Sequence, residues 1–160
     1  MSSPSADVAA TAAALESTGY LADDSLATVV FLAEQMQRPL LLEGEPGTGK
    51  TALAEAMAEQ AGVPLIRLQC YEGIDASQAL YDWDFPRQIL HLRTLEAAAA
   101  GSGFDAEAAE ASLFDDRFLL ARPVLRALRE SPAVLLIDEV DRADDEFEAF
   151  LLEVLSSWSV

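Results

Sequence analysis

Residues 44–51, Gly-Glu-Pro-Gly-Thr-Gly-Lys-Thr, constrain the fold of this chain more than any other stretch. They match the P-loop pattern G-x-x-x-x-G-K-[ST] at every defined position. In such a loop, glycines let the backbone turn tightly and point successive N–H groups at phosphate oxygens. The lysine reaches the β- and γ-phosphates, and the final hydroxyl binds Mg²⁺. The pattern therefore predicts a nucleotide phosphate site.

The flanks of this loop support the same prediction. Residues 39–43, Pro-Leu-Leu-Leu-Glu, predict a short buried parallel strand, and residues 52–58 predict a helix that Gly62 and Pro64 end. A strand, a glycine loop and a helix N-terminus together form an anion site. The candidate nucleotide-binding residues are Gly44, Glu45, Pro46, Gly47, Thr48, Gly49, Lys50, Thr51 and Ala52.

A second candidate site follows an apolar run. Residues 133–137, Ala-Val-Leu-Leu-Ile, predict a buried strand that runs directly into Asp138 and Glu139, which is the Walker B arrangement. We expect Asp138 to hold the Mg²⁺ shell and Glu139 to orient or deprotonate the attacking water, with Lys50 as its catalytic partner at the phosphates. The pairing with a complete P-loop predicts ATP hydrolysis, and Glu139 disfavours a small-molecule kinase.

Composition limits the classes of protein that the chain can belong to. Its 160 residues suit one domain, and a hydrophobic content of 51% indicates a globular protein. A net charge of −18 argues against binding to nucleic acid or anionic membranes, and reflects either a solubility bias or an acidic docking surface. The single cysteine, Cys70, cannot form an internal disulfide and predicts a small buried side chain in a reducing compartment.

Targeting signals are not evident in the sequence. No segment approaches the ~18 apolar residues of a membrane span. The alanine-rich N-terminus carries Asp7 and Glu16 and no basic region, so it does not match a signal peptide. We therefore expect a cytoplasmic protein without a membrane span.

The remaining pattern alternates helices with strands, which predicts an α/β layered domain with a parallel sheet. Residues 65–69 predict the second strand, and residues 81–85 and 118–120 predict short extended pieces. Helices are expected near residues 7–15, 24–36, 86–100, 105–112, 123–128 and from 144 onward. Residues 101–103, Gly-Ser-Gly, are expected to end the helix at 86–100.

Three positions leave alternatives open. Gln69 ends the second strand and either faces the γ-phosphate near Glu139 or is an ordinary polar residue at a strand end. Tyr20 either contacts an adenine edge or packs in the core. Arg142 either pairs with Asp141 or faces a neighbouring subunit.

These motifs resemble a known family. Residues 41–51 and 136–143 resemble AAA+ ATPases, specifically the MoxR family. Residues 68–75, 81–88 and 117–123 are similar to the MoxR branch linked to carbon monoxide dehydrogenase maturation.

The resemblance covers about residues 19–158 and carries several implications. It implies that residues 19–160 form a P-loop NTPase core with three αβα layers, of the AAA+ and ASCE type. Residues 1–18 are expected to be a flexible or weakly helical segment ahead of this core. It implies an ATP- and Mg²⁺-dependent chaperone that assembles as a homo-hexameric ring, matures a client metalloenzyme and acts with a von Willebrand factor A domain partner. Gln69 matches the family's switch residue, and residues 101–122 match an insert directed at the pore or client.

The sequence departs from the family's pattern at residues 158–160. There the family continues into a fourth strand with the sensor-1 asparagine, an arginine finger, a fifth strand and a helical lid. In a sheet of order 5-1-4-3-2, the fourth strand separates the P-loop strand from the Walker B strand, and without it two ladders are unpaired. A neighbour's arginine contributes ~10³ or more in rate. The expected core is thus truncated before the fourth strand, and the alternative function is a non-hydrolysing short form that binds nucleotide or caps a ring.

Overall fold

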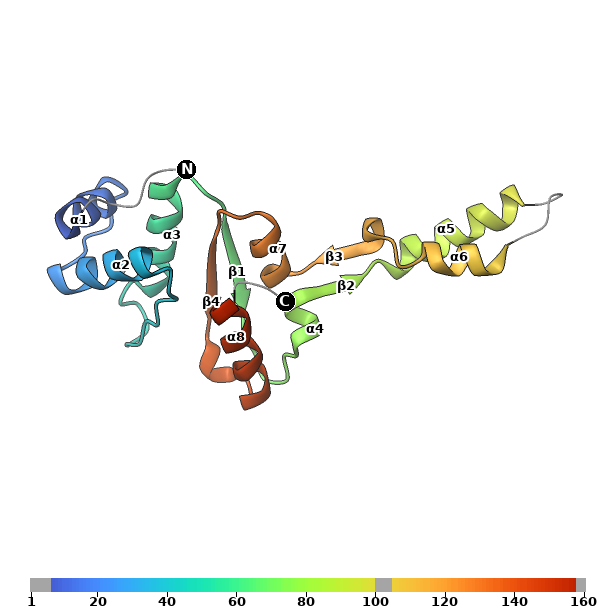
Figure 1. The fold of residues 1–160 in the computed structure, drawn as a ribbon. Coiled ribbons are helices and arrows are strands. Elements are labelled where there is room, and N and C mark those ends of the chain that lie inside the picture. Colours follow the sequence, from blue (N-terminus) through green and yellow to red (C-terminus); the bar gives the residue numbers. More distant parts are fainter. Residues whose placement is uncertain (1–6, 100–104, 158–160) are drawn as a thin grey trace.

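The computed structural model describes residues 7–99 and 105–157 (Figure 1). Its helices are α1 (Val8–Ser17), α2 (Asp24–Met36), α3 (Lys50–Ala61), α4 (Ala76–Leu80), α5 (Phe85–Ala98), α6 (Ala106–Ser112), α7 (Pro123–Arg129) and α8 (Asp145–Ser157). Its strands are β1 (Leu65–Gln69), β2 (Tyr81–Trp83), β3 (Leu119–Ala121) and β4 (Val134–Asp138). The helix end predicted at residues 101–103 and the chain end at 158–160 lie outside the described residues.

The strand that precedes the Asp138–Glu139 pair lies beside β1. β1 and β4 are parallel, with Leu65 opposite Val134 and Gln69 opposite Asp138. This pairing confirms the prediction of an α/β fold with parallel strands. It also confirms that the second strand and the Walker B strand are neighbours. As a result, Gln69 and Asp138 end their strands side by side.

The strand predicted at residues 39–43 is wrong, because the structure has no strand there. The segment keeps an alternating pattern: Leu40 and Leu42 are half-buried against the helices around them, while Leu41 is 71% exposed. A strand exists only through ladder hydrogen bonds to a neighbour, and in the described part of the chain β4 pairs with β1 alone. Leu40 and Leu42 therefore still contact a core, but residues 39–43 pair with no strand in the described part of the chain.

Two core clusters hold the elements together. The first joins α1, α2 and α3 through Leu15, Val30, Leu53 and Ala56. It includes the predicted N-terminal helix, since Leu15 of α1 is fully buried; the domain boundary at residue 18 stays a prediction. The second cluster joins β1, α4, α7 and α8, and its buried members are Leu68, Cys70, Ile74, Ala79, Val124, Phe147, Leu151 and Val154.

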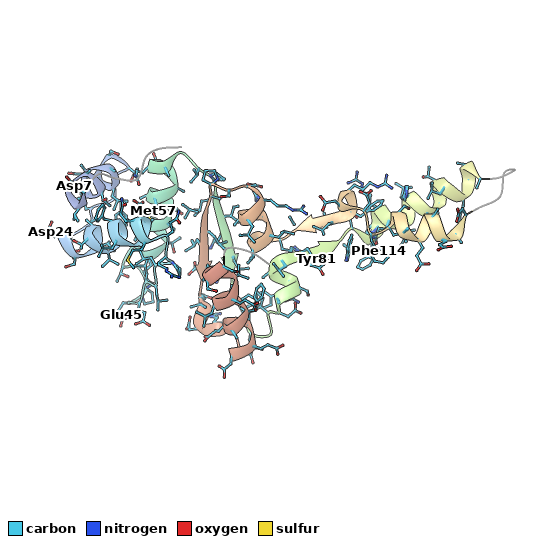
Figure 2. The ribbon with its side chains drawn as sticks, viewed as in Figure 1. Asp7, Asp24, Glu45, Met57, Tyr81 and Phe114 are labelled. Atoms are coloured by element: carbon cyan, nitrogen blue, oxygen red, sulfur yellow. The ribbon has the colours of Figure 1, made fainter. Side chains whose placement is uncertain are left out.

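An arm leaves this second cluster between β1 and β4. β2 and β3 form an antiparallel pair, with Tyr81 opposite Ala121, and they carry α5 and α6 outward from the core (Figure 1). Figure 2 shows Tyr81 at the base of the arm and Phe114 farther out. The insert expected at residues 101–122 is thus larger than predicted, because the arm already begins at β2. None of the helices in residues 7–99 and 105–157 is long and apolar enough to cross a membrane.

The base of the arm makes a pH-dependent contact. The Arg122 guanidinium donates to Asp82 at 2.9 Å and the Trp83 N–H donates to the same carboxylate at 2.8 Å, and these bonds lower the pKa of Asp82. A lowered pKa means that the contact stabilises the fold above the ordinary value of 3.8 and that this contribution is lost as the pH falls through the lower folded value.

We therefore expect Asp82→Asn to lower the thermal unfolding midpoint near pH 6. The difference from the wild type should shrink as the pH falls below the ordinary Asp82 pKa of 3.8. Thermal unfolding of both proteins across this pH range measures the effect. A difference that stays constant with pH would show that the Asp82 charge contributes nothing to the arm.

Candidate nucleotide site

The glycine loop has the backbone geometry that phosphate binding needs. Gly44, Gly47 and Gly49 have φ angles of 151°, 84° and 90°, a region that side chains with a Cβ rarely adopt. A Cβ at Gly44 would also stand 3.4 Å from the Thr48 hydroxyl oxygen. α3 begins at Lys50, directly after the loop, so the positive end of its dipole faces the same region. The loop therefore combines the glycine conformations of a phosphate-binding turn with a helix N-terminus.

The Lys50 side chain folds back over this loop. Its Nζ donates to the carbonyl oxygens of Gly44 at 2.6 Å and Glu45 at 2.9 Å. Figure 2 shows Glu45 at the outer tip of the loop, away from the core. A phosphate is a stronger partner for an ammonium group than a neutral carbonyl. The ammonium group is thus already at the mouth of the loop, where a phosphate can exchange with the two carbonyls.

Tyr20 lies against the helix side of the loop. A Cβ built at Gly49 would stand 3.6 Å from the Tyr20 ring and hydroxyl, and Tyr20 also packs against the cluster formed by α1, α2 and α3. The core packing that the sequence allowed for is therefore present, and the structure adds a position beside the loop. The adenine contact itself stays a prediction.

Two arginines hold the carboxylates of Asp138, the last residue of β4, and of Glu139, which follows it. Asp138 Oδ2 accepts from Arg67 Nη2 at 2.6 Å, and the same nitrogen donates to Gln69 Oε1 at 2.9 Å. Glu139 has a φ of 54° and forms an ion pair of 2.9 Å with Arg142. Arg142 therefore forms a local ion pair with Glu139 and not with Asp141, and its contact with a neighbouring subunit stays a prediction.

Arg67 is the functional-site residue that sequence reasoning missed. A signal for it exists, because residues two apart on a strand point to the same face and Arg67 precedes Gln69 by two. The face that carries the proposed switch residue therefore also carries a positive charge.

Cys70 follows β1 directly and continues its ladder, since its N–H donates to the Asp138 carbonyl at 2.9 Å. The side chain is 1% exposed, which confirms the prediction of a small buried group. Burial raises the pKa of the Cys70 thiol, and the charges of Asp138, Asp141 and Glu139 raise it further. The thiol thus stays protonated beside this acidic strand end.

The structure brings some predicted site residues together and leaves others apart. Gln69, Asp138 and Glu139 meet at the ends of β1 and β4, while Lys50 and Thr51 open α3, which packs against β4. In the described part of the chain, no side-chain hydrogen bond or ion pair joins the loop to Asp138 or Glu139. The catalytic, nucleotide-binding and metal roles of these residues stay predictions.

The residues present fit ATP and Mg²⁺ by their chemistry. Mg²⁺ takes oxygen ligands and is usually held through one or two protein groups together with substrate phosphates. Thr51 supplies a hydroxyl at the start of α3, and Asp138 supplies a carboxylate at the end of β4. The loop supplies backbone N–H groups for the phosphates.

Curated relatives match the chain over limited parts of their own lengths. An uncharacterized protein of Staphylococcus saprophyticus is 29% identical over 121 residues, which cover 76% of this chain and 37% of that protein. The ATP-dependent zinc metalloprotease FtsH 3 of Sphaerobacter thermophilus is 29% identical over 133 residues, covering 78% of this chain and 20% of the protease. Midasin of Giardia intestinalis is 50% identical over 48 residues, which cover 30% of this chain and 1% of midasin. No solved structure matches the chain.

The family comparison covers most of the chain. The model of the AAA family, the ATPase family associated with various cellular activities, matches residues 40–157. This range includes the glycine loop, β1, the arm, β4 and α8. The chain belongs to the AAA family of ATPases.

Proposed function

We propose that this chain is the nucleotide-binding part of a MoxR-type AAA ATPase that uses ATP hydrolysis to remodel or mature a client metalloenzyme. The observation that carries the proposal is the glycine loop at the start of α3, together with Asp138 and Glu139 at the end of the neighbouring strand β4. Membership of the AAA family supports ATP as the nucleotide and Mg²⁺ as its cation.

The proposed mechanism assigns each site residue one task. Lys50 exchanges the carbonyls of Gly44 and Glu45 for the β- and γ-phosphates, which it then orients. Thr51 and Asp138 would hold Mg²⁺, which would supply charge neutralisation at the phosphates. Glu139 leaves Arg142 and orients the attacking water.

The MoxR assignment and the client role are supported by the arm. Two of the segments that resemble the maturation branch, residues 81–88 and 117–123, contain the two paired strands of the arm, β2 and β3. The arm also exposes large apolar side chains: Phe85 is 61%, Leu90 65% and Phe114 67% exposed. Apolar groups on a projecting element are suited to contact another protein. We propose that the arm contacts the client, within a cytoplasmic hexameric ring that acts with a von Willebrand factor A domain partner.

A non-hydrolysing nucleotide-binding or ring-capping module is the second candidate. It is favoured by residues 39–43, which pair with no strand in residues 7–99 and 105–157, and by the arginines that hold Asp138 and Glu139. Since the chain spans 37% of its Staphylococcus saprophyticus relative, hydrolysis is proposed for the assembled protein rather than for these residues alone.

Two measurements test the two candidates: ATP binding by calorimetry and ATP hydrolysis by phosphate release. Each is made on residues 1–160 alone and on the proposed hexameric ring, here called the assembled ATPase. We expect both preparations to bind Mg·ATP and the assembled protein to hydrolyse it. Binding without phosphate release in either preparation would favour the non-hydrolysing module. Absence of ATP binding in both would contradict the proposed function.

A further inference from the structure

One arginine joins the metal carboxylate to the neighbouring strand. Arg67 Nη2 lies 2.6 Å from Asp138 Oδ2 and 2.9 Å from Gln69 Oε1, so both of its hydrogens are used. The Asp138 side chain is 26% exposed and the Arg67 side chain 53%. The contact spans two strands, because Gln69 and Asp138 are directly opposite in the register. Arg67 thus holds two predicted site residues at once.

This contact occupies the carboxylate that Mg²⁺ would use. The second oxygen of Asp138, Oδ1, accepts the N–H of Glu139 at 3.1 Å, so both carboxylate oxygens already have a partner. Mg²⁺ requires close oxygen contacts of about 2.0–2.1 Å. A guanidinium group at hydrogen-bond distance from the same carboxylate would both obstruct this approach and repel the cation. The arginine and the metal therefore compete for Asp138.

We propose that Arg67 is a positioning residue that holds Asp138 and Gln69 in the metal-free site, and that the Mg²⁺ of an incoming nucleotide displaces it from Asp138. This inference rests on the proposed function and adds a step to it. Arg67 Nη2 donates to both Asp138 and Gln69. Because the same nitrogen makes both hydrogen bonds, its displacement from Asp138 also changes the hydrogen bonding of Gln69. Metal binding at Asp138 is thereby coupled to the residue that resembles the family's switch.

Other arginine pairs of the chain differ in their position. Arg126 pairs with Glu130 at 2.7 Å on α7, and Arg129 pairs with Asp116 at 2.7 Å. Neither pair includes Asp138, Glu139 or Gln69. The variant Arg126→Met is therefore a control. It removes one positive charge and an ion pair of similar length, and it leaves Asp138, Glu139 and Gln69 unchanged.

The test is the Mg²⁺ dependence of ATP binding by the chain at a fixed ATP concentration. If Arg67 competes with Mg²⁺ for Asp138, removing it lowers the Mg²⁺ concentration at which ATP binding is half-maximal. We expect Arg67→Met to lower this midpoint about threefold, which corresponds to the loss of a partly exposed ion pair. Arg67→Lys should return the midpoint toward the wild-type value, because an ammonium group can still reach Asp138. Arg126→Met should leave the midpoint unchanged.

Two results would overturn the inference while leaving the proposed function intact. Equal Mg²⁺ midpoints for Arg67→Met, Arg126→Met and the wild type would show that Arg67 does not compete with the metal. Weaker ATP binding by Arg67→Met at saturating Mg²⁺ would show that Arg67 contacts the nucleotide instead. If the wild type binds no nucleotide at any Mg²⁺ concentration, both the inference and the proposed function fail. Thermal unfolding without nucleotide checks that the variants are folded.

Discussion

Lys50→Ala is expected to weaken ATP binding by at least about 100-fold, because Lys50 would make charge-assisted hydrogen bonds to two phosphates and each such bond contributes about 1.5–3 kcal/mol. In the structure its ammonium group is satisfied by the carbonyls of Gly44 and Glu45, both of which belong to the loop. Lys50→Ala therefore removes the positive charge that lies beside the loop's backbone carbonyls. Calorimetric titration with Mg·ATP measures the change.

Arg93→Ala is the matched control for Lys50→Ala. It removes one positive charge from an exposed position on α5, in the arm rather than in the loop. We expect this variant to bind ATP like the wild type. Equal Mg·ATP affinities of Lys50→Ala and the wild type would contradict the assignment of nucleotide binding to the glycine loop.

Glu139→Gln is expected to slow ATP hydrolysis by the assembled protein about 100-fold while ATP affinity stays unchanged, since a positioned general base contributes about 10²–10⁴ in rate. The amide keeps the size of the side chain but cannot accept a proton from water. Glu139 follows β4 and is held at 2.9 Å by Arg142, so the change also removes that ion pair. Phosphate release measured at saturating ATP, beside a binding titration, separates the two effects.

Asp141→Asn serves as the control for Glu139→Gln. Asp141 is exposed in the same turn and the substitution makes the same change of charge, but the residue has no proposed role in hydrolysis. We expect its rate to stay near the wild-type rate. Similar losses in both variants would indicate that the acidity of the turn, and not Glu139 itself, supports hydrolysis.

Much of the fold could be predicted because its signals are local. Asp75 accepts the Gln78 N–H and caps α4, as expected for an aspartate ahead of a short helix. Pro86 lies in the first turn of α5, where its missing N–H has no cost. The apolar runs that became β1 and β4 were likewise recognisable from composition alone. Each of these signals depends on a few consecutive residues.

The remaining features depend on contacts between residues that are distant in the sequence. Residues 39–43 have the composition of a strand, but a strand also needs a neighbouring ladder. Arg67 and Asp138 are 71 positions apart, so their contact follows from the β1–β4 register and not from any motif. On α2, the apolar residues Val29 and Met36 stand seven positions apart, as on one helix face, yet they are 46% and 64% exposed. Period alone does not determine which apolar residues meet a partner.

The most direct test of the account is a backbone amide NMR spectrum of residues 1–160 recorded with and without Mg·ATP. The account predicts that the largest shifts occur at residues 44–51 and at the first turn of α3, where N–H groups would meet the phosphates, and that Lys50→Ala suppresses these shifts. Unchanged amide signals in the loop at saturating Mg·ATP, or shifts confined to the arm, would contradict the claim that this loop is the nucleotide site.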